Sequence, residues 1–146
     1  MTDTEKHPLI DQAYQLRRSG DRRGALNLYL EAARALRAEA DDTIALASAI
    51  RHTADLHEEL RESHAAWQAY EAAWALYLTV SPLPDLDLAN CRRPMALWQE
   101  RRGSPAMALS LWGDAREWYE KAAVSTGLDL RVAVLECERH ITALGR

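Results

Sequence analysis

Residues 20–32 (GDRRGALNLYLEA) and residues 103–115 (GSPAMALSLWGDA) superpose without a gap at a separation of 83 residues. The small and aromatic positions coincide: Gly20 falls on Gly103, Ala25 on Ala108, Tyr29 on Trp112 and Ala32 on Ala115. A third and less regular copy occupies residues 65–73 (AAWQAYEAA). Because an internal repeat indicates stacked copies of one small unit, it determines the fold before any local pattern does.

The segments around the three copies have the composition of helices. Ala, Leu, Glu and Arg dominate them, and glycine and proline occur at only a few places, where they mark helix ends. The pattern predicts an all-α fold of three helical hairpins and a closing helix. The hairpins span about residues 8–40, 42–79 and 85–125, and the last helix spans about 129–144. The spacing between hairpins is about 41 residues, and short turns impose antiparallel packing within each one.

Capping residues and apolar stripes give finer predictions. The helix starts are expected at Pro8, at Asp21, within Asp41-Asp42-Thr43, at Ser63 and at the pair Ser104-Pro105, and Gly127 is expected to end the sixth helix. Apolar residues at helical spacing are assigned to the interior. They include Ile44 on the third helix and Val132 with Ile141 on the last.

Composition limits the classes of protein to consider. A chain of 146 residues with 48% hydrophobic and 27% charged residues is expected to form one domain, residues 1–146. A formal net charge of −4 argues against a broad nucleic-acid surface. No secretory signal and no membrane-length apolar run is visible, and Cys91 and Cys137 have no metal-ligand spacing. We therefore expect a cytoplasmic protein with reduced core cysteines, without a nucleic-acid or membrane partner.

On these residues the chain resembles the tetratricopeptide-repeat family. The resemblance rests on Ala13, Gly20, Ala25, Tyr29 and Ala32 in the first hairpin, and in the third on Ala96, Gly103, Ala108, Trp112 and Ala115. It covers about residues 8–123, and the middle copy departs from it because Arg61 stands at the place of the turn glycine. The resemblance implies a tetratricopeptide-like right-handed α-solenoid of three helical hairpins plus a C-terminal capping helix.

In that family the first helix of each hairpin lines a concave groove. The resemblance thus implies eight peptide-binding residues: Tyr14, Arg17, Arg51, Asp55, Asn90, Arg93, Leu97 and Arg101. Arg51 and Arg93 stand at equivalent places, and with Asn90 they would hold a carboxylate such as a peptide C-terminus. The alternative is internal pairing, in which Arg51 pairs with Asp55 along the helix and Arg17 bridges to Glu58.

The sequence predicts a non-catalytic scaffold that binds a protein or peptide partner with acidic groups or a C-terminal carboxylate. It contains no nucleophile elbow, phosphate loop or HExxH motif, so we expect no enzyme, no cofactor and no metal. One alternative is a self-associating assembly subunit, a homodimer that uses the first hairpin or the Trp67–Trp74 stripe. A less favoured alternative is a metal or small-molecule sensor that uses His52, Asp55 and His57.

Overall fold

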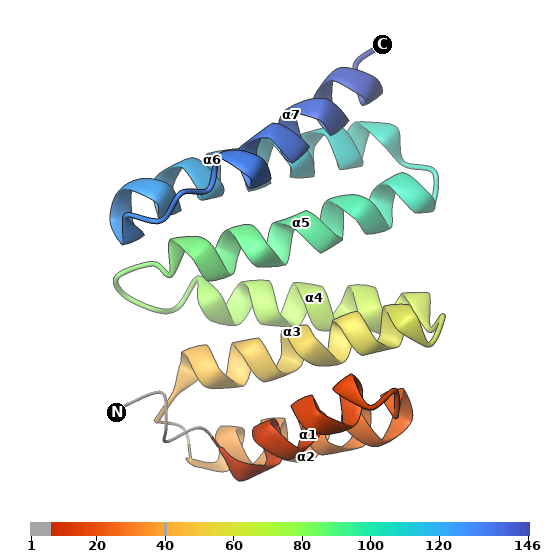
Figure 1. Cartoon of the computed structure of the whole chain (residues 1–146), viewed down its shortest axis with the longest axis vertical. Coiled ribbons are helices and arrows are strands. Elements are labelled where there is room, and N and C mark those ends of the chain that lie inside the picture. The colour runs from red at the N-terminus through yellow and green to blue at the C-terminus, as the bar shows by residue number, and fades with distance from the viewer. Residues whose placement is uncertain (1–6, 40) are drawn as a thin grey trace. The chain divides into compact units, whose positions relative to one another are not determined.

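The computed structural model describes residues 7–39 and 41–146, and every regular element in these ranges is an α-helix. The expected first-hairpin end at residue 40 and the N-terminal segment 1–6 lie outside these ranges. The chain divides into two compact units, one up to Leu76 and one from Tyr77 to Arg146 (Figure 1). The seven helices are α1 (Pro8–Arg18), α2 (Arg22–Glu39), α3 (Thr43–Glu59), α4 (Ser63–Tyr77), α5 (Asp85–Arg101), α6 (Pro105–Thr126) and α7 (Arg131–Leu144).

The first unit packs around the residues that form the repeat. Its core contains Ala13 of α1, Ala25 and Tyr29 of α2, and Leu56 of α3. Alanine allows α1 and α2 to approach closely, and the tyrosine ring fills the space toward α3. The remaining helix of this unit, α4, runs antiparallel to α3 and is joined to it by a hydrogen bond from Tyr70 to Asp55 (Figure 1).

The second unit repeats this arrangement with α5, α6 and α7 in place of α1, α2 and α3. Its core contains Ala96 of α5, Ala108 and Trp112 of α6, and Cys137 of α7. Ala13, Ala25 and Tyr29 therefore pack in the first unit as Ala96, Ala108 and Trp112 pack in the second. Both cysteines are buried and reduced, as expected, and burial raises the pKa of the Cys137 thiol to about 11.

The helix starts agree closely with the capping signals. Pro8 begins α1, and the carboxylates of Asp21 and Asp42 accept hydrogen bonds from the amides of Gly24 and Ala45, each at 2.9 Å. Ser104 precedes Pro105 at the start of α6, and Gly127 ends that helix with a left-handed φ of 74°. The prediction for Ser63 is wrong by one residue, because Ser63 is already the first residue of α4.

Two predictions of inward-facing residues are wrong. Ile44 is 38% exposed and Val132 is 80% exposed. Val132 lies in an apolar run of α7 that offers two overlapping stripes, and the stripe that contains Cys137 is the one that packs on α6. Ile44 lies in the first turn of α3, where few neighbours cover it. Within the described residues no helix combines the length and apolar character that a membrane span needs.

One turn closes all three hairpins. Gly20, Arg61 and Gly103 all have a positive φ, at 94°, 63° and 85°. In each hairpin the amide after this residue donates to the carbonyl five residues earlier: Asp21 to Leu16 at 2.9 Å, Glu62 to His57 at 2.8 Å and Ser104 to Gln99 at 3.1 Å. This is the pattern of a helix end with a left-handed residue. The middle hairpin therefore keeps the turn although it has lost the glycine.

We expect Arg61→Gly to stabilise the protein by about 0.5–1 kcal/mol. A side chain strains a left-handed backbone by about 1–2 kcal/mol, and the greater freedom of glycine in the unfolded chain offsets part of this gain. Urea denaturation followed by circular dichroism measures the change. Gly20→Ala is the matched control and should destabilise, because no atom lies within 4 Å of its added Cβ and strain alone acts. An Arg61→Gly variant less stable than wild type would contradict the shared turn.

Candidate functional site

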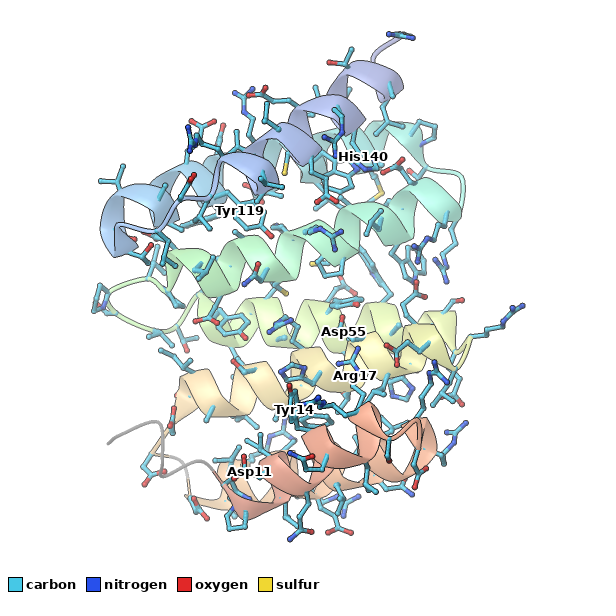
Figure 2. The ribbon with its side chains drawn as sticks, in the orientation of Figure 1. Asp11, Tyr14, Arg17, Asp55, Tyr119 and His140 are labelled. Carbon is cyan, nitrogen blue, oxygen red and sulfur yellow. The ribbon has the colours of Figure 1, made fainter. Side chains whose placement is uncertain are left out.

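Four of the eight predicted site residues lie together in the first unit. Tyr14 and Arg17 are three residues apart on α1, and Arg51 and Asp55 are four apart on α3, so each pair shares one helix face. Figure 2 shows Tyr14, Arg17 and Asp55 directed to the same side of α1 and α3. We call the surface formed by Tyr14, Arg17, Arg51 and Asp55 the α1–α3 face.

The basic residues of the α1–α3 face are held by carboxylates of α3. Nη2 of Arg17 donates to Oε1 of Glu59 at 2.7 Å, and Nη1 of Arg51 lies 3.6 Å from Oδ2 of Asp55. The expected pairing of Arg51 with Asp55 is thus confirmed. The expected bridge from Arg17 to Glu58 is wrong by one position, because side chains of packed helices interdigitate rather than stand directly opposite each other.

Asp55 is a largely buried carboxylate of this face. The hydroxyl of Tyr70 on α4 donates to Oδ1 of Asp55 at 2.5 Å. Burial raises the pKa of Asp55, while that hydrogen bond and the guanidiniums of Arg51 and Arg17 act in the opposite direction. The carboxylate therefore links α3 to α4 and pairs with Arg51 on α3.

An aromatic pair lies beneath the same face. The rings of Tyr29 and His52 stack with their centroids 5.0 Å apart and an angle of 18° between their planes. Burial, and after it the positive charges of Arg51 and Arg17, lowers the pKa of His52 to about 4. Its Nδ1 is buried without a hydrogen-bond partner among the described residues. The imidazole is therefore neutral at physiological pH and acts as a packing ring.

The outermost residue of the face is aromatic. Tyr14 is 50% exposed, and the guanidinium of Arg18 lies 5.8 Å from the centre of its ring. An exposed tyrosine beside oriented arginines is a surface that suits a peptide, since tyrosine and arginine supply much of the energy of protein interfaces. Each guanidinium has five N–H donors, so a carboxylate on one side does not exhaust its capacity.

The other four predicted residues lie in the second unit, and two of them serve its internal structure. Nε and Nη2 of Arg93 donate to Glu136 of α7 at 2.6 and 2.9 Å, a two-pronged ion pair. This hydrogen bonding lowers the pKa of Glu136. Oδ1 of Asn90 accepts from the hydroxyl of Tyr119 at 2.8 Å. Glu136 and Asn90 therefore hold parts of the second unit together.

Leu97 and Arg101 differ in exposure. Leu97 is half-buried and packs against the core of the second unit, whereas Arg101 at the end of α5 is exposed. Of the predicted pair of carboxylate-binding arginines, Arg51 holds Asp55 in the first unit and Arg93 holds Glu136 in the second. The α1–α3 face is thus the part of the predicted site that keeps an exposed aromatic residue.

Sequence reasoning missed a polar cluster in the second unit. Oε2 of Glu100 accepts from Nε1 of Trp112 at 2.5 Å and lies 2.8 Å from Nδ1 of His140, which stacks on Trp112 at 4.0 Å. Figure 2 labels His140 and Tyr119 in this unit. The sequence does contain a signal for ion pairs between helices: the residues of the pairs Arg17–Glu59 and Arg93–Glu136 are each separated by about one hairpin length. Opposite charges at that spacing predict contacts between successive hairpins.

The three residues named for a metal or small-molecule sensor each contact a different side chain. His52 stacks on Tyr29, Asp55 bonds to Tyr70, and Nδ1 of His57 lies 3.0 Å from Glu62. Within residues 7–39 and 41–146, no group of three or more His, Cys, Asp or Glu side chains is arranged to hold a metal ion.

Comparison with known proteins found no family model that matches the chain and no similar curated protein.

Proposed function

We propose that the chain is a non-catalytic scaffold that binds a peptide segment of a partner protein through the α1–α3 face. The observation that carries this proposal is the half-exposed Tyr14 beside Arg17 on α1, facing the Arg51–Asp55 pair on α3. Ion pairs fix both arginines before a ligand arrives, which reduces the entropy lost on binding. The tyrosine would pack against an apolar side chain, and the arginines would bind acidic groups.

The proposal includes a tetratricopeptide-like right-handed α-solenoid in which the α1–α3 face forms part of a concave groove. The support for it is the repeat itself: equivalent small residues, an aromatic residue at equivalent places in both units, and one closing turn in all three hairpins. Asn90, Arg93, Leu97 and Arg101 would be the groove residues of the second unit. In such a groove Arg93 would meet a ligand only together with Glu136.

A capture experiment with a matched pair of variants tests the proposed function. Tyr14→Ala removes the exposed ring, and Met107→Ala is the control, because Tyr14 and Met107 are both 50% exposed. Immobilised wild type and both variants are incubated with lysate of the source cell, and captured proteins are identified by mass spectrometry. We expect a partner retained by wild type and Met107→Ala and weakened about 30-fold by Tyr14→Ala, as for an interface residue worth about 2 kcal/mol.

Two results would contradict the proposal. Equal capture by Tyr14→Ala and wild type would remove the α1–α3 face from the interaction. Capture of nothing except the chain itself would favour self-assembly. Arg17→Gln serves as a second variant, because glutamine keeps much of the side-chain packing while it removes the charge.

A further inference from the structure

A comparison of the two units draws attention to a second surface, on α7. In the first unit α3 packs on α2 with His52 stacked on Tyr29, and in the second α7 packs on α6 with His140 stacked on Trp112. Tyr29 and Trp112 are the aromatic residues that superpose in the repeat. The two histidines therefore mark equivalent positions, and α7 is the counterpart of α3.

α3 and α7 differ in the exposure of the face that points away from the preceding helix. Ala47 and Ala49 are two residues apart, as are Ala54 and Leu56. Two residues on an α-helix are related by a rotation of about 200°, so Ala47 and Ala54 point away from Ala49 and Leu56. All four are buried on α3, which is flanked by α2 and, through the Tyr70–Asp55 hydrogen bond, by α4 (Figure 1). On α7 the aligned positions of Ala47 and Ala54 are Leu135 and Thr142, and both are exposed.

The exposed side of α7 combines apolar and basic groups. Val132 is 80% and Leu135 53% exposed near the beginning of the helix. A hollow of about 420 Å³ continues from Leu135 along the helix past Glu138, Arg139 and Thr142 to Arg146. A second hollow of about 480 Å³ at the α6–α7 corner is lined mostly by apolar side chains, among them Leu128, Val134 and Leu135, with Glu120, Asp129 and Arg131 also in the lining. The surface thus exposes Val132 and Leu135 at the N-terminal half of α7, and at its C-terminal half Arg139 and Arg146 outnumber the one carboxylate, Glu138.

We propose that this side of α7 is a docking site for an amphipathic helix of a partner protein, which lies antiparallel to α7 as α4 lies on α3. An antiparallel helix places its C-terminal half against Val132 and Leu135, so that half carries small or apolar residues. Its N-terminal half meets Arg139 and Arg146 and carries acidic residues. Acidic residues in a first helical turn are also favoured by the helix dipole, so one sequence satisfies both requirements.

A peptide derived from α4 tests this proposal directly. The probe is a fluorescent peptide of residues 63–77 with Ser63→Glu and Trp67→Glu, which places two acidic groups in its first half beside the Ala66–Tyr70–Ala73 stripe. The control peptide carries lysine at the same two positions. Fluorescence anisotropy with the full chain should show saturable binding of the acidic peptide and affinity at least about tenfold weaker for the lysine peptide.

Variants of the full chain separate this surface from the remainder of the molecule. Leu135→Asp should weaken the acidic peptide about tenfold or more, and Arg139→Glu should abolish the preference over the lysine peptide. Leu83→Asp, at an exposed leucine in the loop between α4 and α5, is the control and should bind as wild type does. Equal affinity for both peptides, or a Leu135→Asp variant that binds normally, would overturn the proposal.

Sedimentation velocity of the chain alone tests whether a second copy of the chain covers α7. We expect no association that depends on Leu135. A dimer that disappears in Leu135→Asp would show that a second copy covers α7, and would overturn the partner helix as the occupant.

Discussion

Trp112→Ala is expected to destabilise the protein by about 3–5 kcal/mol, the usual cost of removing a large aromatic side chain from a core. Trp112 is fully buried between α5, α6 and α7. The substitution leaves a cavity, removes the N–H that donates to Glu100 at 2.5 Å, and removes the ring on which His140 stacks. Urea denaturation followed by circular dichroism should show a large decrease in the midpoint.

Trp118→Ala is the matched control, because it removes the same side chain from the same helix. Trp118 is half-buried at the edge of the core, with the ammonium of Lys121 4.5 Å from its ring centre. We expect a loss of about 1–2 kcal/mol from the smaller buried area and the lost cation–π contact. Equal losses for the two variants would contradict the assignment of Trp112 as the packing residue of the repeat.

The stability of the first unit is expected to fall between pH 6.5 and pH 4 because of His52. The folded protein holds the pKa of this imidazole at about 4, below its ordinary value of 6.5. Below pH 6.5 the unfolded chain takes up a proton that the folded chain excludes, so protonation favours unfolding. A difference of about 2.5 pKa units corresponds to about 3 kcal/mol, which is fully lost once the pH is below about 4.

His52→Phe should remove this dependence, because phenylalanine keeps a flat ring against Tyr29 and does not titrate. The quantity to compare is the change in unfolding free energy from pH 7 to pH 4.5 in each variant. His64 is exposed at the start of α4, so His64→Gln should retain the wild-type slope. The pKa values of Glu62 and Glu136 are lowered by hydrogen bonds from His57 and Arg93, respectively, and those carboxylates destabilise the protein only at lower pH. If the unfolding free energy of His52→Phe changed with pH as much as that of wild type, the claim that His52 is buried and neutral would be contradicted.

The helices could be predicted from the sequence because the signals that define them are local. Asp42 and Gly127 act within one turn of their own helix, and the repeat of Ala25 and Tyr29 in Ala108 and Trp112 fixes which faces pack. α7 was harder to orient, since apolar residues surround most of its first turns. There the packing of Cys137 against α6 decides which stripe is buried.

The partners of the site residues could be predicted only in part. Arg51 and Asp55 pair within one helix, where the i,i+4 rule applies. Arg17 with Glu59 and Arg93 with Glu136 join different helices, and a shift of one residue in how those helices pack changes the partner. The polar cluster of Glu100, Trp112 and His140 depends on three helices and leaves no single-helix pattern.

The central claim is that the α1–α3 face binds a peptide, and chemical-shift mapping tests it most directly. The shortest active fragment of the captured partner is titrated into the ¹⁵N-labelled full chain. We predict shifts that concentrate on the amides around Tyr14 and Arg17 of α1 and around Arg51 and Asp55 of α3, and that vanish in Tyr14→Ala. Shifts confined to α7 or to the Trp67–Trp74 stripe of α4, with the α1–α3 face unchanged, would contradict the claim.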